Sequence, residues 1–412
     1  MKTINNKICR MCNSRKFTSI VNLGKHPLVN RLVEKKNLKQ KDPYFQLHVK
    51  QCQKCKLAQL KEIIDSDEIY KKTDYLYFSS EMPNLGKYFK SYADDLKKRF
   101  LKKNDLVVEI GCNDGLMLKN FKSKQRILGV DPATNVILRA LKKKIPAIPE
   151  FFTDDIAKKI VNEWGQAKLV YGNNCIAHLN NLKDVASGVS RLLARGGVFV
   201  IECNYWGRMV KNTNYGLIYH DHFSYFSVKN LTEFCKRYDL FAFDAIVTDA
   251  QGGSLRIFFS KGKRIKTERY KKLLKEEIDN KLNSINVSVK YRKKVYQTTN
   301  KLKKLIIELK RKRKKIAGYG AAAKGMTIIK SSGIGKKHID YFVDDSPAKQ
   351  GLYTAGDKIP IISRAQASKK LPDYFIILAP NYSKFIIEKE KNFISKGGKF
   401  IVPVGDIDVV GK

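Results

Sequence analysis

Two histidines flank an aspartate in the stretch YHDHFSYFS, which occupies residues 219 to 227. The chain holds only six histidines among 412 residues, so a pair this close is uncommon. Imidazole, with an ordinary pKa of about 6.5, is suited to accept a proton near neutral pH. The same residues also suit the aromatic end of a buried strand. The stretch therefore indicates either a proton-transfer site or a packed strand end.

The backbone conformation decides which of these side chains can meet. In a regular strand, Tyr219 and Asp221 would lie on one face, and His220 and His222 on the other, because side chains alternate. We therefore expect the segment to turn if Tyr219 and His222 act at one site. His220 is then expected to face away from that site as a structural residue.

Four of the eight cysteines form two Cys-x-x-Cys pairs, Cys9 with Cys12 and Cys52 with Cys55. Together they supply the four thiolates that Zn²⁺ prefers in a tetrahedral site. The 39 residues between the pairs must fold back to bring them together. A closed four-cysteine site leaves no open coordination position, so the predicted zinc is structural and not catalytic.

A glycine turn follows an apolar strand in the stretch LVVEIGCNDG, and LMLKNF after it predicts the start of a helix. The turn lacks the Gly-Lys-Ser/Thr ending of a phosphate loop, and its glycines, Gly111 and Gly115, do not make G-x-G-x-x-G. A second strand ends at Asp131, 20 residues after Gly111, where a carboxylate can accept both ribose hydroxyls. These features favour S-adenosylmethionine, with NAD as the alternative.

The pattern of segments divides the chain into four parts. From residue 105, strands alternate with helices, which predicts a doubly wound parallel α/β sheet. A charged, mostly helical stretch interrupts the pattern, and strand-and-turn signals then resume. We expect a zinc-binding module (1–70), a sheet domain (71–262), a lysine-rich helical connector (263–315) and a second α/β domain (316–412).

The net charge is +42, from 81 Lys and Arg against 39 Asp and Glu. Such a field attracts nucleic acid, anionic membranes or phosphorylated ligands. The lysines are spread along the chain, however, so the narrower inference is tolerance for a phosphate-bearing ligand. The N-terminus has no apolar signal region and no segment approaches the ~18 apolar residues of a membrane span. These features predict a cytoplasmic protein without a membrane partner.

Several motifs together point to one family. EIGCNDG, GVDP, NNCIAHLNNL, YHDHFSYFS, QGGSLRIF, GYGAAAKG and DDSPAKQGLY follow the two cysteine pairs in this order. With them the chain resembles, over nearly its whole length, the sugar-nucleotide C-methyltransferases that make branched deoxysugars. The resemblance implies a class I S-adenosylmethionine-dependent methyltransferase with a Rossmann-like fold, a zinc-binding N-terminal module and a Rossmann-like C-terminal domain. It also implies a monomer.

The resemblance assigns roles to individual residues. It implies a cofactor pocket made by Gly111, Asn113, Asp114, Gly115, Asp131 and Asn173. It places around the reacting sugar carbon Tyr77, His178, Tyr219, Asp221 and His222. It implies contacts to the nucleotide diphosphate sugar from Lys324, Lys349 and Asn381.

The chemistry explains why the family needs such residues. A keto group at sugar carbon 4 acidifies the hydrogen at carbon 3, and a base removes it. The enolate then attacks the sulfonium methyl group. We expect His222 to be the base, with Asp221 orienting it, and His178 or a tyrosine hydroxyl to donate to the enolate oxygen. His178 and Tyr77 remain alternative bases.

Two positions depart from the family pattern, and two other functions stay open. The family often has glutamate where Asp221 stands and histidine where Gln251 stands. The first departure touches the active site that the resemblance implies, so the substrate and the methylated carbon stay open. The charge and cysteine pairs also suit a nucleic-acid methyltransferase, although NPPY-type and PC-type motifs are absent from the sequence. A non-catalytic basic scaffold is the third possibility.

Overall fold

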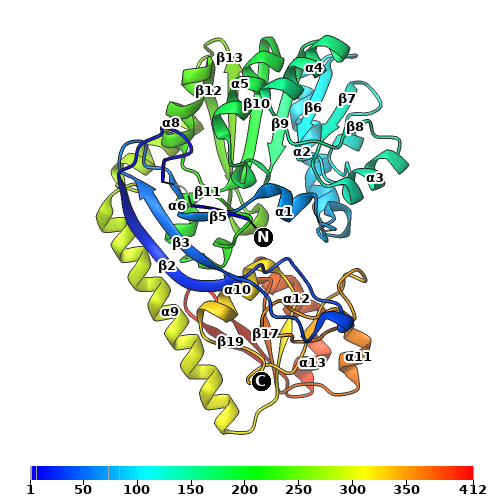
Figure 1. Cartoon of the computed structure of the whole chain (residues 1–412), viewed down its shortest axis with the longest axis vertical. Helices are drawn as coiled ribbons and strands as arrows, with labels where there is room; N and C mark the ends of the chain where they lie inside the picture. The colour runs from blue at the N-terminus through cyan, green and yellow to red at the C-terminus, as the bar shows by residue number, and fades with distance from the viewer. Residues whose placement is uncertain (1, 6, 73, 83, 412) are drawn as a thin grey trace.

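We describe the protein from a computed structural model that covers residues 2–5, 7–72, 74–82 and 84–411. A large α/β domain lies at the top of Figure 1 and a smaller one at the bottom. The long strands β2 and β3 and the helix α9 run between them along one side. None of the helices in the described ranges combines the length and hydrophobicity needed to cross a membrane.

The N-terminal module is an antiparallel sheet of strand order β11-β4-β3-β2, beside a ribbon of β1 and β5. Strand β11 (Ser224–Tyr225) comes from the large domain, where it follows the histidine pair, and it places Ser224 opposite Gln59 of β4. The module is thus joined by backbone pairing to the segment that follows the histidines. Its own elements are β1 (Thr3–Asn5), β2 (Phe17–Pro27), η1 (Lys35–Asn37), β3 (Tyr44–Cys52), β4 (Ala58–Leu60), β5 (Glu62–Ile64) and α1 (Ser66–Tyr70).

The large domain is built on a seven-stranded sheet of order β12-β13-β10-β9-β6-β7-β8. Strands β6 to β10 are parallel, and β13 and β12 add an antiparallel edge. The central strand β6 reads LVVEI and is buried throughout, as expected for a strand covered on both faces. The strand order reverses between β6 and β9, where ligands of such sheets bind beyond the carboxyl ends. The predicted doubly wound sheet is confirmed.

Helices flank this sheet, and local capping fixes several of their starts. The side chains of Thr153, Asn181 and Ser227 each accept a backbone N–H in the first turn of α4, α5 and α7. The elements of the domain are η2 (Ser79–Glu81), α2 (Leu85–Phe100), β6 (Leu106–Ile110), η3 (Leu118–Asn120), β7 (Arg126–Val130), α3 (Thr134–Lys142), β8 (Ala147–Ile148), α4 (Asp154–Trp164), β9 (Ala167–Asn173), η4 (Ile176–His178), α5 (Leu182–Leu192), β10 (Leu193–Asn204), α6 (Trp206–Lys211), η5 (Tyr215–Leu217), α7 (Val228–Cys235), η6 (Lys236–Tyr238), β12 (Leu240–Thr248), η7 (Ala250–Gly252) and β13 (Ser254–Lys261).

The segment after the glycine turn differs from expectation. LMLKNF forms only the 3-10 turn η3, where the sequence predicts the start of a helix. The side-chain amide of Asn120 donates to the carbonyls of Leu116 and Met117, which a continuing helix would pair with its own backbone N–H groups.

The C-terminal domain repeats the α/β design on a smaller scale. Its sheet has the order β16-β15-β14-β17-β18-β19, parallel except for β19. Two helices lead into it, α8 (Glu268–Asp279) and the long α9 (Ile285–Arg311). The remaining elements are β14 (Ile316–Tyr319), α10 (Ala323–Ser331), β15 (Phe342–Val343), β16 (Ile361–Ile362), α11 (Arg364–Ser368), β17 (Tyr374–Ile377), η8 (Pro380–Tyr382), α12 (Ser383–Lys389), α13 (Lys391–Ser395), β18 (Lys399–Val402) and β19 (Asp408–Val410).

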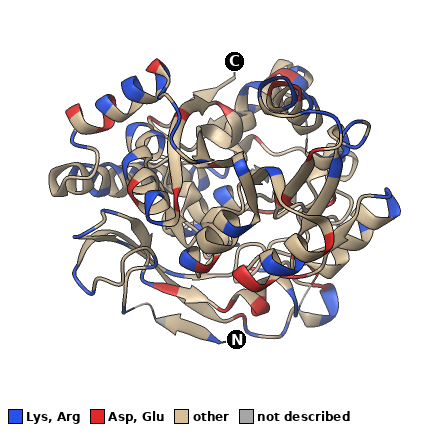
Figure 2. Cartoon of the chain, turned by 90° about the horizontal axis from the view of Figure 1, so that it is seen from above, with Lys and Arg blue, Asp and Glu red and all other residues tan. Residues whose placement is uncertain are grey.

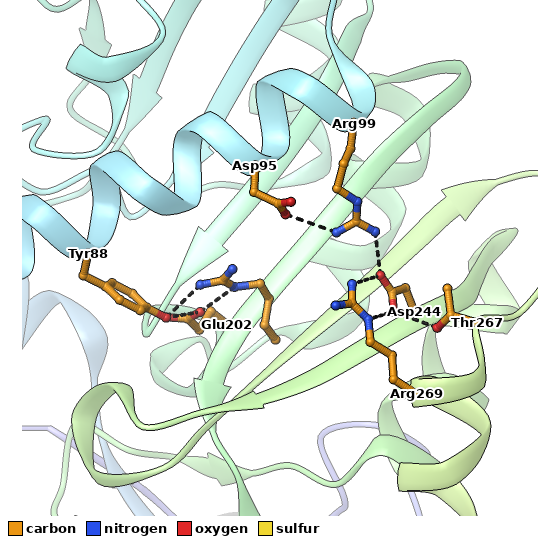
Figure 3. A network of polar contacts seen from close by, with 8 residues as sticks. Tyr88, Asp95, Arg99, Glu202, Asp244, Thr267 and Arg269 are labelled. Atoms are coloured by element: carbon orange, nitrogen blue, oxygen red, sulfur yellow. Dashed lines mark hydrogen bonds and ion pairs between the residues drawn. The ribbon is translucent and has the colours of Figure 1, made fainter.

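A buried carboxylate ties the connector to the large domain (Figure 3). Asp244 lies in β12 and is fully buried. It accepts hydrogen bonds from Arg99 at the end of α2 (2.5 Å) and from Thr267, the N-cap of α8 (2.7 Å), and it also pairs with Arg269. Buried charges are stable only when paired and hydrogen-bonded. The cluster therefore fixes α8, and with it the start of the connector, against the sheet.

Candidate active site

A cavity of about 260 Å³ lies where the three parts meet. The N-terminal module contributes Val29, Asn30 and Leu32, and the C-terminal domain contributes the residues around the start of α10. Tyr70 of the N-terminal module and Lys349 and Asn381 of the C-terminal domain also line it, and the large domain supplies most of the remaining wall. Of the predicted site residues, the cavity is lined by Tyr77, Gly111, Asn113, Asp131, Asn173, His178, Tyr219, His222, Lys324, Lys349 and Asn381.

The reversal point between β6 and β9 forms one end of the cavity. Gly111 has a φ of +70°, and a Cβ there would come within 2.4 Å of Cys175. The Asp131 carboxylate accepts the N–H groups of Asn113 and Ala133, each at 3.0 Å, and burial raises its pKa to about 6. The buried Oδ1 of Asn173 has no hydrogen-bond partner among the described residues. A backbone turn, a carboxylate and a free amide oxygen suit a nucleoside that carries hydroxyl and amino donors.

Two predicted cofactor residues lie behind this turn and outside the cavity wall. Asp114 is fully buried and pairs with Lys143, whose Nζ is 3.1 Å away. Gly115 has a φ of +74°, and a Cβ there would come within 2.4 Å of Ile145. Both residues shape the turn. Their predicted contact with the cofactor stays a prediction.

A strap of residues 75–81 crosses this end of the cavity. The Asn135 side chain, from α3, bonds both the N–H and the carbonyl of Tyr75, at 3.3 and 3.1 Å. Asn113 does the same further along, accepting from the Ser79 N–H at 2.8 Å and donating to the Tyr77 carbonyl at 3.0 Å. Two asparagines therefore pair with the strap as a neighbouring strand would, and Tyr75 and Tyr77 line the cavity.

The histidine pair lies in a turn, as expected if Tyr219 and His222 converge. The His222 N–H donates to the Tyr219 carbonyl at 3.0 Å, which brings the two rings together. The His222 Nδ1–H donates to the Leu217 carbonyl at 2.7 Å. In the neutral ring Nε2 is then the acceptor, and the Tyr219 hydroxyl donates to it at 2.7 Å. Burial keeps the pKa of His222 well below its ordinary value, and the neighbouring His178 adds to the effect.

His220 faces away from the cavity, as predicted. Its Nε2 bonds the Phe45 carbonyl of β3 at 3.2 Å, and its ring packs edge-on against Phe45. The turn thus directs one histidine of the pair into the N-terminal module and the other toward the cavity.

His178 stands beside His222, with ring centroids 4.9 Å apart. Burial lowers its pKa to about 4, so the ring is neutral at pH 7. Its Nδ1 lies 2.6 Å from the hydroxyl of Tyr70, at the end of α1. The sequence analysis missed Tyr70. A tyrosine at the end of a short amphipathic segment carries no signal of its own, and its partner is 108 positions away.

Asp221 is also buried, and burial raises its pKa to about 6. Asn30 of the N-terminal module donates to its Oδ2 at 2.6 Å. Asn30 was likewise not predicted, because 191 positions separate it from its partner. Asp221 is not among the residues that line the cavity, so its predicted place at the reacting sugar carbon stays a prediction.

The wall nearest the C-terminal domain carries Gln251 and Lys324. Gln251 has a φ of +54°, a conformation that non-glycine residues rarely adopt. Lys324, in the first turn of α10, donates to the Gln251 carbonyl at 2.8 Å and to its Oε1 at 3.1 Å. The Gln251 side chain also bonds the Tyr77 hydroxyl. Burial lowers the pKa of Lys324 to about 7.

Lys349 and Asn381 complete this side. Lys349 Nζ contacts the Asp344 carboxylate and the Ala321 carbonyl, each at 3.2 Å, and Asn381 follows β17. Asp344 in turn accepts the Ala321 N–H at 2.7 Å, so the loop before α10 is held by its own side chains.

The four predicted zinc ligands come together away from the cavity. All four sulfur atoms lie within 4.8 Å of one another, with Cys9 and Cys55 at 3.4 Å and Cys12 and Cys52 at 3.5 Å. A tetrahedral site with Zn–S bonds of about 2.3 Å has sulfur atoms about 3.8 Å apart. The donor set and its spacing fit Zn²⁺.

Three family models match successive parts of the chain. They are described as "Putative zinc binding domain" (residues 9–70), "Methyltransferase domain" (85–241) and "C-methyltransferase C-terminal domain" (249–405). The C-methyltransferase NovU of Streptomyces niveus is 32% identical over 406 residues, which cover 98% of this chain and 96% of NovU. The chain belongs to the C-methyltransferase family. Each of the three matched regions contributes to the cavity wall of this C-methyltransferase.

Other proteins are similar over part of the chain. The uncharacterized methyltransferase C70.08c of Schizosaccharomyces pombe is 28% identical over 151 residues, 35% of this chain and 54% of that protein. A solved S-adenosylmethionine-dependent methyltransferase from Clostridium acetobutylicum shows 13% identity and a TM-score of 0.34, covering 45% of this C-methyltransferase and 94% of that chain.

Proposed function

We propose that this methyltransferase transfers a methyl group from S-adenosylmethionine to carbon 3 of a nucleotide diphosphate-linked 4-keto deoxysugar. The observation that carries the proposal is His222, a buried neutral imidazole that lines a cavity shared by all three parts, with its Nδ1–H fixed on Leu217 and its Nε2 bonded to the Tyr219 hydroxyl. A C–H beside a ketone is acidic enough for an imidazole to remove. A sugar ketone therefore suits this site better than an unactivated carbon.

His222 is the proton acceptor in this proposal. Burial keeps its ring neutral, so Nε2 carries a lone pair at pH 7. The Tyr219 hydroxyl bonds that lone pair, so the proton is proposed to be relayed: the Tyr219 oxygen takes the carbon 3 proton as its own proton passes to Nε2. Asp221, in the same turn as His222, is held by Asn30 of the N-terminal module and is proposed to keep that turn in place.

His178 is the proposed donor to the enolate oxygen. If the Tyr70 hydroxyl donates to Nδ1, the neutral ring carries its proton on Nε2. A donor fixed before the reaction stabilises negative charge that develops on oxygen. The lowered pKa keeps His178 neutral, so it acts as a hydrogen-bond donor and not as a second cation.

Two ends of the cavity would hold the two ligands. S-adenosylmethionine supplies an electrophilic methyl group when it is bound, and Gly111, Asp131 and Asn173 are the residues proposed to hold its nucleoside end. Lys324, Lys349 and Asn381 are proposed to contact the nucleotide diphosphate at the other end. The strap covers the first end and limits the access of water, which protects an enolate from reprotonation.

The test is deuterium exchange at carbon 3 of a nucleotide-linked 4-ketosugar, followed by mass spectrometry with and without S-adenosylmethionine. We expect the wild type to exchange and then to add one methyl group. His222→Gln should lower both rates by about 10²–10⁴-fold, the usual contribution of a general base. His220→Gln is the matched control, because that ring belongs to the same turn but bonds Phe45.

Other outcomes would change the proposal. Exchange that survives in His222→Gln would move the base to His178 or Tyr77. A wild type that reacts with no ketosugar but methylates RNA or DNA, with salt-sensitive binding, would favour the nucleic-acid alternative.

A further inference from the structure

A buried arginine stands inside the first Cys-x-x-Cys pair. Arg10 lies between Cys9 and Cys12 and is only 6% exposed. Lysine and arginine are rarely buried to this extent without several partners. Its surroundings therefore show what the side chain holds in place.

The Arg10 guanidinium bonds the backbone directly after the turn of residues 219–222, which holds His222. Its Nη1 donates to the Phe223 carbonyl at 2.9 Å, and Phe223 directly follows His222. The same carbonyl accepts the Leu60 N–H of β4 at 3.0 Å. Arg10 also donates to the Leu60 carbonyl at 3.3 Å and to the Gln59 side chain at 3.2 Å. The turn that carries His222 is thus fastened to β4 by a backbone bond and by Arg10.

The same side chain also reaches the segment that carries His178. Arg10 Nε donates to Asn180 Oδ1 at 3.3 Å, two positions after His178. The Phe223 N–H donates to the Ala177 carbonyl at 2.8 Å, one position before His178. The two histidine segments are therefore bonded to each other and to one guanidinium. That arrangement sets the separation of the two imidazoles, whose ring centroids are 4.9 Å apart.

The cysteine cluster gives a reason for an arginine at this position. Gln59 accepts from Arg10 and donates to Cys9 Sγ at 3.2 Å, so the guanidinium and a zinc ligand share a partner. Four thiolates around Zn²⁺ carry a net charge of −2, which stabilises a cation buried beside them. A planar guanidinium can donate to several acceptors in fixed directions, whereas a lysine ammonium cannot match that geometry.

We propose that Arg10 is a positioning residue for the methyl-transfer reaction, which connects the zinc knuckle to the segments that hold His222 and His178. This inference rests on the proposed function for the roles of the two histidines. It gives the zinc module a part in catalysis that involves no contact with the reacting atoms. Loss of Arg10 should leave the ligand pockets in place and disturb the relative placement of the two rings.

The experiment compares Arg10→Met and Arg10→Lys with Arg237→Met in the full chain. Arg237 is a matched control, because it donates to the Met11 carbonyl of the same knuckle at 2.8 Å but, among the described residues, bonds neither histidine segment. Zinc content, thermal unfolding and the carbon 3 exchange are measured for each. We expect every variant to retain one zinc per chain. Arg10→Met should lose about 10²-fold in kcat for exchange with little change in KM, as for a misplaced catalytic group.

The pattern among the variants decides between positioning and simple folding. Arg10→Lys should recover part of the lost exchange, and Arg237→Met should keep all of it. Wild-type exchange in Arg10→Met would overturn the proposal. Equal losses of zinc and of exchange in Arg10→Met and Arg237→Met would also overturn it, because Arg10 would then only maintain the zinc fold.

A second measurement needs no substrate. Nitrogen NMR of labelled histidine reports which ring nitrogen carries the proton, and the wild type should show His222 protonated on Nδ1, through Leu217. Arg10→Met should perturb the signals of both His222 and His178, and Arg237→Met should perturb neither. Unchanged signals in Arg10→Met would contradict the inference, whatever the substrate proves to be. If the signals move but no ketosugar exchanges in the wild type, the proposed function fails and the positional link stands.

Discussion

The two cavity histidines differ from ordinary surface histidines in how their protons are fixed. His222 has one nitrogen committed to the Leu217 carbonyl and the other to the Tyr219 hydroxyl, while His178 meets Tyr70. Burial lowers the pKa of both rings. The site therefore holds both imidazoles neutral over the neutral pH range, with the Nε2 lone pair of His222 bonded to the Tyr219 hydroxyl.

Asp221 gives a prediction about stability at the scale of one residue. Burial raises its pKa to about 6, above the value of about 3.9 expected for an unfolded chain. Ionisation of Asp221 thus opposes folding. Below about pH 4 the Asp221 carboxyl is protonated in both the folded and the unfolded protein and carries no penalty. The folded protein then loses stability as the pH rises through 6. A shift of about 2 units corresponds to roughly 3 kcal/mol, so Asp221→Asn should be more stable than the wild type at pH 7.5 by up to that amount.

Denaturant unfolding at several pH values between 5 and 7.5 measures this difference. The advantage of Asp221→Asn should grow as the pH rises toward 6 and level off above it. Asp114→Asn is the contrasting control, because Asp114 is paired with Lys143 and should lose stability when neutralised. A constant difference between Asp221→Asn and the wild type across the range would show that Asp221 has an ordinary pKa.

Part of this site could be predicted from the sequence, and part could not. The rule that strands alternate, combined with the family resemblance that assigns Tyr219 and His222 to one site, led to the expectation of a turn with His220 as a structural residue. Tyr70 and Asn30 were not predictable, because each acts through a partner more than a hundred positions away. The chemical type of a side chain can be read from its own position in the sequence. The hydrogen bonds that select a histidine tautomer depend on residues that only the tertiary fold brings together.

At the scale of elements, the strap of residues 75–81 is the feature that the glycine turn and α3 hold in place. Asn135 bonds both backbone groups of Tyr75, and replacing it with alanine would leave these groups to water or unpaired. Lost hydrogen bonds of this kind cost about 1–3 kcal/mol. Asn135→Ala should therefore weaken binding of S-adenosylmethionine by about tenfold or more.

Calorimetric titration with S-adenosylmethionine measures the effect. Asn280→Ala serves as the control, because that side chain bonds a carbonyl at the exposed end of α8. Affinity should be unchanged there. Equal affinities in Asn135→Ala and the wild type would mean that the strap does not close over the cofactor end of the cavity.

The alternation of strands and helices was readable from the sequence, because each buried strand is a short apolar run bounded by turn residues. The strap and η3 were not. Tyr75 to Glu81 has no apolar period, and its conformation is imposed by two asparagines from other elements. LMLKNF forms only a 3-10 turn, in which the Asn120 side chain bonds the carbonyls of Leu116 and Met117. In the strap and in η3, side-chain hydrogen bonds near the proposed cofactor site determine the backbone conformation, and local secondary-structure propensity does not.

At the scale of the whole molecule, polar contacts join the three parts. Glu81 of the strap accepts hydrogen bonds from Arg139 of α3 and from Ser346 of the C-terminal domain, at 2.8 and 2.9 Å. Asp42 of the N-terminal module pairs with Lys358 of the C-terminal domain at 2.6 Å. Each of the three parts therefore has a polar contact with another.

The charge of +42 belongs to this scale as well. In Figure 2, basic residues are spread over helices and loops around the whole outline of the molecule. A nucleic-acid surface usually shows lysine and arginine clustered on one face or along one helix. The distribution supports a general attraction for anions, and it directs attention to the few lysines that line the cavity.

Lys324 provides the test of that attraction. Burial lowers its pKa to about 7, so the free enzyme holds a mixture of ammonium and amine near neutral pH. A diphosphate binds the ammonium better than the amine, so affinity for a nucleoside diphosphate should be highest below pH 7. It should fall as the pH rises from 7 to 8, because binding must then supply the missing proton.

Lys324→Met should lower that affinity by about 10–100-fold at pH 6.5 and remove the pH dependence, since a hydrogen bond to a charged group contributes about 1.5–3 kcal/mol. Lys330→Met is the matched control: Lys330 lies on the same helix, α10, but pairs with Asp357 and does not line the cavity. Titration with a nucleoside diphosphate at pH 6.5 and 8 separates the two. Equal losses in both variants would mean that the ligand responds to the overall charge of the molecule. A loss confined to Lys324→Met would place the diphosphate at the start of α10, opposite the glycine turn that is proposed to hold the cofactor.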